Sequence, residues 1–124
     1  MKKSNLSCPH GHSDDAWATK TVSVVIDRPL GSYHPTQRTL YYPVNYGYVE
    51  GVLAADGEEQ DAYVLGVDVP IERFTGKLIA VIRRRDDVED KWVVAPPACF
   101  LTKEEIKAMT DFQERFFDTE IYML

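Results

Sequence analysis

The chain has 124 residues, 44% of them hydrophobic, and a formal net charge of −6. That length predicts one domain, and this apolar fraction is enough for a buried core. No apolar run approaches the ~18 residues of a membrane span, and the acidic balance argues against general nucleic-acid binding. The start of the chain lacks the apolar stretch of a secretory signal, and two cysteines are too few for a disulfide framework, so we expect a cytoplasmic protein.

Residues 1–19 predict an irregular N-terminal lead-in to a single domain over residues 20–124. They contain Cys8, His10 and His12, which are residue types that bind transition metals. Their spacing matches no zinc-site pattern, so we expect a loosely held terminus here.

The remainder of the chain shows the pattern of a small β-protein. Strands are predicted in chain order over residues 21–26, 46–53, 63–67, 77–83 and 92–94. Between the first two strands, Pro29, Gly31 and Pro35 predict a loop. Short strands without a βαβ rhythm favour a mainly β (α+β) fold, a small antiparallel barrel with one helix packed on it.

That single helix is predicted near the C-terminus. Thr102 and Glu105 have the spacing of a capping box, which marks a helix start. After them, apolar residues recur every three or four positions, at Ile106, Met109, Phe112 and Phe116. This spacing predicts one apolar stripe that packs on the core.

The negative charge is concentrated in the middle of the chain, where 11 of the 20 acidic residues lie between Glu50 and Asp90. The pair Asp56-Gly57 between two strands predicts a hairpin turn. A turn that places Asp56, Glu58 and Asp61 on one concave side would also supply the oxygen ligands that Mg²⁺ prefers.

A second acidic group, residues 86–90, precedes Lys91. A solvated hairpin tip explains it by itself, and its spacing favours that interpretation. The alternative is that it joins the first group across the barrel mouth to form a site for two or three metal ions.

Tyrosines alternate at Tyr42, Tyr46 and Tyr48. Alternating aromatic residues commonly pack one face of a strand, which is what we expect of Tyr48. For Tyr42 and Tyr46, core packing and hydroxyl donation to phosphate are equally good interpretations.

Together and in this order, these segments resemble the family I soluble inorganic pyrophosphatases. The run Tyr42–Tyr48 is similar to the family's Y-P-x-N-Y-G-Y/F segment, and residues 56–61 match its D-x-D-x-x-D spacing with Glu in the middle. Residues 24–29 resemble the family's V-x-I-E-x-P strand. Residues 86–96 resemble its later acidic loop, which ends in Asp-x-Lys before an apolar strand. The resemblance covers about residues 22–97.

The resemblance implies an OB-like five-stranded barrel that hydrolyses pyrophosphate to two phosphates with Mg²⁺. The loop would supply one ligand from Asp86 or Asp87 and one from Glu89 or Asp90. The implied metal ligands are Asp27, Asp56, Asp61, Asp87 and Asp90. The implied catalytic residues are Glu58, which would deprotonate the attacking water, and Tyr46. The implied substrate-binding residues are Arg28, Arg38, Tyr42, Tyr46 and Lys91.

One difference from the family suggests a second hypothesis. The family's late Tyr-Lys pair, which grips phosphate, falls at Phe116-Phe117. The alternative is therefore a pyrophosphatase-like protein that binds a phosphorylated ligand or a partner without turnover. Hydrolysis of an organic diphosphate is a third hypothesis, for which the residues identify no substrate. The resemblance also implies a homo-oligomer.

Overall fold

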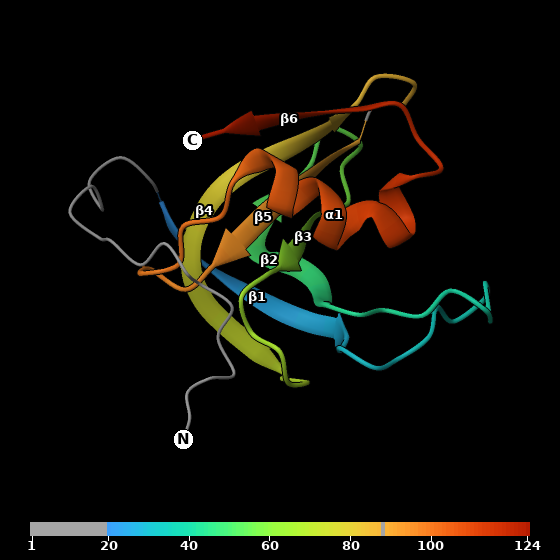
Figure 1. The fold of residues 1–124 in the computed structure, drawn as a ribbon, viewed down its shortest axis with the longest axis horizontal. Helices are drawn as coiled ribbons and strands as arrows, with labels where there is room; N and C mark the ends of the chain where they lie inside the picture. The colour runs from blue at the N-terminus through green and yellow to red at the C-terminus, as the bar shows by residue number, and fades with distance from the viewer. Residues whose placement is uncertain (1–19, 88) are drawn as a thin grey trace.

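A strongly bent sheet and one helix make up the part of the chain that the computed structural model describes, residues 20–87 and 89–124 (Figure 1). In chain order the elements are β1 (Thr21–Arg28), β2 (Asn45–Leu53), β3 (Glu59–Val64), β4 (Arg73–Arg84), β5 (Asp90–Ala95), α1 (Lys103–Glu114) and β6 (Thr119–Met123). The cluster of Cys8, His10 and His12 lies outside the described residues. No helix of the described part is long and apolar enough to cross a membrane.

The strands β1 to β5 close into a barrel. Hydrogen-bonded neighbours follow the order β1-β2-β3-β5-β4, and β4 pairs again with β1. Closure depends on the 12-residue strand β4, because its residues 73–77 pair with β1 and residues 77–83 pair with β5. The prediction of an OB-like five-stranded barrel with a C-terminal helix is confirmed.

The barrel was predicted to be antiparallel, and one pair departs from this, because β3 and β5 run parallel. The strand β4 lies between β1 and β5 and runs antiparallel to both. The other edge of β5 pairs with β3, and these two strands run in the same direction. The extra strand β6, which the sequence pattern did not predict, pairs antiparallel with residues 80–84 of β4. The strand predicted at residues 63–67 is shifted to Glu59–Val64, since Gly66 takes a positive φ of 86° beyond its end.

Two apolar clusters lie on the two faces of the central strands. One joins Val24 of β1 to Val64 of β3 and Val94 of β5. The other joins Tyr63 of β3 to Ile106 of α1. The neighbours Tyr63 and Val64 belong to different clusters, because successive side chains point to opposite faces. The strand β3 is therefore covered on both sides, and its helix-facing side chains form one wall of the candidate site.

The helix α1 begins with the predicted capping box. The Thr102 hydroxyl accepts from the backbone N–H of Glu105 at 3.1 Å, and the Glu105 carboxylate accepts from the backbone N–H of Thr102 at 2.8 Å. Ile106 is buried, but the helix ends at Glu114 and Phe116 is 68% exposed, so the predicted stripe stops short of Phe116.

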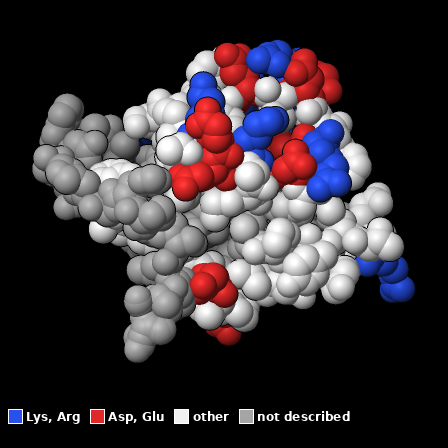
Figure 2. All heavy atoms as spheres, viewed as in Figure 1, with Lys and Arg blue, Asp and Glu red and all other residues white. Residues whose placement is uncertain are grey.

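Charged side chains gather at one end of the molecule, around the β4–β5 connection and β6 (Figure 2). Acidic and basic groups alternate there and form ion pairs, among them Arg83–Asp90 at 3.3 Å and Arg85–Asp118 at 2.6 Å. Much of the negative charge in this part of the chain is thus neutralised locally by the arginines of β4 and the turn that follows it.

Candidate phosphate-binding site

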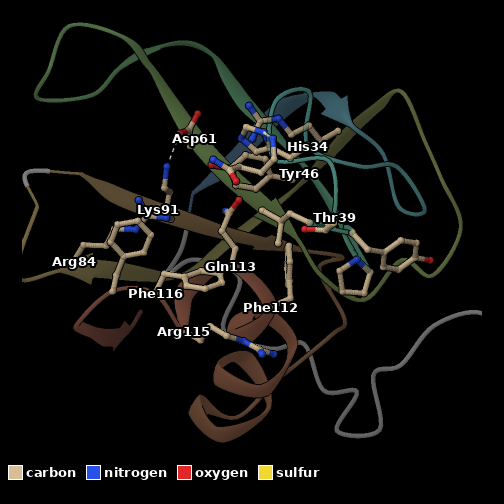
Figure 3. Close-up of a pocket in the computed structure, with 16 residues that line it drawn as sticks. His34, Thr39, Tyr46, Asp61, Arg84, Lys91, Phe112, Gln113, Arg115 and Phe116 are labelled. Atoms are coloured by element: carbon tan, nitrogen blue, oxygen red, sulfur yellow. Dashed lines mark hydrogen bonds and ion pairs between the residues drawn. The ribbon is translucent and has the colours of Figure 1, made fainter.

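A pocket of about 840 Å³ lies between the loop at residues 29–43, the strands β3 and β5, and the end of α1 (Figure 3). It is lined by Arg28, His34, Gln37, Thr39, Leu40, Tyr41, Pro43, Tyr46, Asp61, Arg84, Lys91, Phe112, Gln113, Arg115, Phe116 and Phe117. Arginine, lysine and histidine side chains reach it from several elements, so the pocket can hold an anion.

Lys91 projects from β5 toward this pocket. Its side chain is only 5% exposed, and its Nζ donates to Asp61 Oδ2 at 2.6 Å and to Glu89 Oε1 at 2.7 Å. Burial lowers the pKa of Lys91, but Tyr46, Asp61 and Glu89 raise it by more, so the net pKa lies well above the usual value. Lys91 therefore keeps its positive charge at neutral pH.

Arg28, at the end of β1, supplies a second cation. Its Nη1 donates to Tyr42 Oη at 2.8 Å, and its guanidinium lies 5.7 Å and 5.6 Å from the ring centroids of Tyr42 and Tyr46. Burial raises the pKa of both phenols. Both tyrosines are buried in the core and both contact Arg28, so the packing interpretation is confirmed, and hydroxyl donation to phosphate stays a prediction.

A third cation, Arg84, is held by the helix. Its Nη2 and Nε donate to the two carboxylate oxygens of Glu114 at 2.9 Å and 3.0 Å, with both side chains nearly buried. The guanidinium carbon lies 3.6 Å from the centroid of the Phe117 ring. Tyr63 Oη also donates to Glu114 at 2.6 Å. This network joins β3 and β4 to the last turn of α1.

Four residues of the site and its supporting network were not predicted from the sequence, namely Arg84, Gln113, Glu114 and Arg115. Arg84 stands in a run of three arginines, and only the alternation of β4, in which Ala80 and Ile82 are buried on the same face, could have selected it. The helix residues had no such signal, because their contacts come from how α1 docks on the barrel.

Two of the predicted acidic residues, Asp56 and Glu58, are exposed in the turn between β2 and β3. Asp56 Oδ1 accepts from the backbone N–H of Glu58 at 2.9 Å, and Gly57 has a φ of 85°. The predicted hairpin turn at Asp56-Gly57 is confirmed. Asp61, in contrast, lies within β3 and reaches the pocket beside Lys91.

The acidic loop contributes Glu89 to the pocket's edge through its bond to Lys91. Asp90 points to the other side of β5 and pairs with Arg83, because neighbouring strand residues face opposite ways. Asp87 lies 4.0 Å from Arg84 Nη1, and Asp86 accepts a long bond of 3.4 Å from the backbone N–H of Asp118.

The last two predicted residues are Asp27, just before the loop at residues 29–43, and Arg38, within that loop. Asp27, at the end of β1, keeps much of its surface in water, but partial desolvation of the carboxyl raises its pKa above the usual value despite the lowering effect of Arg28. Arg38 is exposed on the loop, outside the set of residues that line the pocket.

Two carboxylates beside Lys91, those of Asp61 and Glu89, are candidate ligands for a hard metal ion. Within residues 20–87 and 89–124, His, Cys, Asp and Glu side chains form no group of three or more that could hold a metal. Asp61 and Glu89 nevertheless converge on one point, the Lys91 ammonium. Mg²⁺ is usually bound by one or two carboxylates together with substrate phosphates, so Asp61 and Glu89 have suitable ligand chemistry, but the Lys91 ammonium occupies the point where the two carboxylates meet.

Comparison with known proteins points to one family. The family model described as inorganic pyrophosphatase matches residues 16–122. The inorganic pyrophosphatase of Yersinia pestis is 31% identical over a 103-residue alignment that covers 77% of this chain and 54% of that protein. The chain thus spans about half the length of this curated relative.

Several solved structures of similar fold are also inorganic pyrophosphatases. The inorganic pyrophosphatase of Ehrlichia chaffeensis has a TM-score of 0.65 and 16% identity, over 84% of this chain and 86% of that one. That of Neisseria gonorrhoeae has a TM-score of 0.58 and 21% identity, over 74% and 70% of the two chains. At these identities the likeness establishes a shared fold.

Proposed function

Because the chain belongs to the inorganic pyrophosphatase family, we propose that it hydrolyses inorganic pyrophosphate to two phosphates with Mg²⁺. The observation that most supports this is the pocket in which Arg28 and Lys91 stand beside the carboxylate of Asp61. Fixed cations in a partly buried pocket bind a phosphate anion and stabilise the charge that develops as its P–O bond breaks.

Each phosphate-binding group has a distinct task in this proposal. Arg28 binds phosphate oxygens with the guanidinium nitrogens left free by its bond to Tyr42. Lys91 supplies a compact positive charge near the same Tyr46 ring, with its Nζ 5.8 Å from the ring centroid. The Tyr46 phenol, whose pKa is raised by burial, stays protonated and donates a hydrogen bond to a phosphate oxygen.

The carboxylates hold the metal and manage the proton. Asp61 and Glu89 would hold Mg²⁺, and Asp27, Asp56, Asp87 and Asp90 remain further predicted ligands. When bound, the ion supplies charge neutralisation and makes a neighbouring water more acidic. Glu58, at the middle position of the acidic motif, accepts the proton of the attacking water. Its assignment rests on that motif position.

Release of phosphate from pyrophosphate tests the proposal. We expect Mg²⁺-dependent turnover by the wild-type chain, abolished by a chelator and restored by added Mg²⁺. The matched control is the double variant Glu58→Gln/Asp61→Asn, which keeps the size of both side chains and removes both charges. Turnover no higher than that of the control, in both the presence and the absence of Mg²⁺, would refute the proposed activity.

Assembly and location are part of the same proposal. We infer a homo-oligomer in the cytoplasm, as the family resemblance and the composition imply. Light scattering of the purified chain gives the mass in solution, and a monomer at micromolar concentration would contradict the first of these two predictions.

A further inference from the structure

Arg84, the last residue of β4, lines the pocket, and the proposed function gives it no task. Its side chain is only 6% exposed and is paired with the buried carboxylate of Glu114. Replacing a buried ion pair with apolar side chains of similar size is often neutral for stability. Stability alone therefore does not explain a buried arginine beside a pocket, and the geometry of its guanidinium indicates a role in binding.

Two contacts fix the plane of the Arg84 guanidinium. Its Nε and Nη2 donate to the two carboxylate oxygens of Glu114, at 3.0 Å and 2.9 Å. The Phe117 ring lies against the same group, with the guanidinium carbon 3.6 Å from the ring centroid. Because the side chain is already held in one conformation, little side-chain entropy is lost when an anion binds to it.

The guanidinium of Arg84 also keeps donors for a ligand. Of its five N–H groups, two are used by the hydrogen bonds to Glu114. A third bond, from Nη1 to Glu89 Oε1, is long at 3.4 Å, and Asp87 Oδ2 lies 4.0 Å from the same nitrogen. Counted over the described residues, these hydrogen bonds leave two N–H groups for the oxygens of a phosphate.

One carboxylate oxygen shows that Arg84 and Lys91 act at the same point. Glu89 Oε1 accepts from Lys91 Nζ at 2.7 Å and from Arg84 Nη1 at 3.4 Å. In Figure 3, Arg84 lies next to Lys91 in the lining of the pocket. An oxygen atom of a bound phosphate at this place would therefore contact both cations, as the Glu89 oxygen does.

We propose that Arg84 is a phosphate-binding residue, which together with Lys91 binds one phosphate group of pyrophosphate at the place that Glu89 Oε1 occupies. The inference rests on the proposed function and adds a residue to its phosphate-binding groups. In that function Glu89 turns to Mg²⁺, which leaves its place beside the two cations to a substrate oxygen. Arginine suits the task, because its planar fork of N–H groups matches the oxygens of a phosphate.

The same residue bears on the family's late Tyr-Lys pair, which falls at Phe116-Phe117 in this chain. Phe117 carries no charge, but the group that covers its ring is the guanidinium of Arg84. A cation therefore lies beside this position, supplied by β4 instead of by the segment that follows α1. Loss of the pair thus does not by itself favour a protein that binds without turnover.

Two variants that differ only at Arg84 test the proposal. Glu114→Gln weakens the ion pair and leaves the arginine in the pocket, whereas Arg84→Met/Glu114→Gln removes both buried charges. The probe is methylenediphosphonate, a non-hydrolysable analogue of pyrophosphate, and calorimetry with Mg²⁺ measures its affinity. We expect the double variant to bind it at least about tenfold more weakly than Glu114→Gln does, because charge-assisted hydrogen bonds are lost.

The matched control is Arg85→Met. Arg85 follows Arg84 in the chain, is 48% exposed, pairs with Asp118 and lies outside the set of residues that line the pocket. Its replacement should change the affinity by no more than about twofold, because salt screens an exposed charge. Thermal unfolding checks that all three variants are folded at the temperature of the titration.

A second measurement uses the wild-type chain and so does not depend on the folding of a variant. The Nε–H of Arg84 donates to a buried carboxylate, which slows its exchange with water and makes its NMR signal observable. This signal should shift when methylenediphosphonate is added, because the probe binds the same guanidinium. The corresponding signal of the exposed Arg85 should stay unchanged.

The outcomes separate the role of Arg84 from the proposed function. A difference of less than about threefold between the two Glu114 variants overturns the role, as does an unmoved Arg84 signal in a chain that binds the probe. Turnover of pyrophosphate then leaves the proposed function intact. Arg84-dependent binding without turnover supports the role and refutes the hydrolysis. If the wild-type chain does not bind the probe, the inference is overturned.

Discussion

The ammonium of Lys91 lies 2.6 Å from the carboxylate of Asp61, across the parallel strands β5 and β3. The two residues are 30 positions apart in sequence, yet their strands run in register, with Ala62 opposite Trp92. A cation and an anion are thus held at one point of the pocket wall by backbone pairing. This arrangement makes Lys91 the residue whose removal should affect the pocket most.

Replacing Lys91 with methionine should lower kcat/KM for pyrophosphate by about 100-fold or more, because a fixed charge facing the phosphate is lost. The carboxylates of Asp61 and Glu89 would then repel each other and the substrate. The measurement is steady-state phosphate release. Lys77→Met is the matched control, since Lys77 is another buried lysine of the barrel and lies outside this pocket. Equal losses in the two variants would contradict the assigned role.

The buried ion pair between Arg84 and Glu114 should be a major determinant of stability. Glu114→Gln keeps the shape and an acceptor for Tyr63 but leaves the Arg84 charge with only its longer pairs to Glu89 and Asp87, at 3.4 Å and 4.0 Å. Breaking a buried ion pair typically costs about 3–5 kcal/mol of unfolding free energy, and we expect a loss toward the lower end of that range. Urea unfolding measures the change. The comparison is Asp118→Asn, which breaks the exposed pair with Arg85 and should cost much less. A similar cost for both pairs would argue against the buried network.

The helix cap gives a test of local structure alone. Thr102→Ala removes the acceptor for the Glu105 N–H and should lower the free energy of unfolding by about 1 kcal/mol. Thr102→Ser keeps the hydroxyl and should retain most of the wild-type free energy of unfolding. Thermal unfolding compares the two variants. If the serine variant were as destabilised as the alanine variant, the capping hydrogen bond would not be the cause.

His34 should titrate below its ordinary pKa of 6.5, because burial and then the nearby charge of Arg28 lower its pKa. Its Nδ1 also accepts from the backbone N–H groups of Thr36 and Gln37, at 3.1 Å and 3.0 Å. A lowered folded-state pKa means that its contribution to stability is present above pH 6.5 and is lost as the pH falls through the folded-state pKa.

An NMR titration of the ring protons measures this pKa, and the amide shifts of Thr36 and Gln37 should follow the same curve. Arg28→Met should move the pKa of His34 back toward 6.5. A pKa at or above 6.5 in the wild-type chain would contradict the prediction. The prediction would also be contradicted if the pKa of His34 were unchanged in the Arg28→Met variant and the amide shifts of Thr36 and Gln37 did not change with pH.

Local patterns in the sequence were sufficient for much of the fold. The short β-branched run at residues 21–26 predicted β1, and the Asp56-Gly57 pair predicted the turn between β2 and β3. The Thr102–Glu105 spacing predicted the start of the helix. Each of these signals depends on residues within a few positions of one another, where strand geometry, turn dihedrals and capping bonds act. The order of motifs along the chain then identified the family.

The tertiary structure decided which charges meet. The sequence predicted Asp61 and Lys91 as site residues, but only the parallel pairing of β3 with β5 brings them within hydrogen-bond distance. The docking of α1 likewise brings Glu114 to Arg84 and leaves Phe116 in the open pocket. Contacts between distant segments depend on how whole elements pack, and no periodicity within one segment encodes them. The composition determined that the chain is acidic, and the packing determined that one pocket of it is lined by cations.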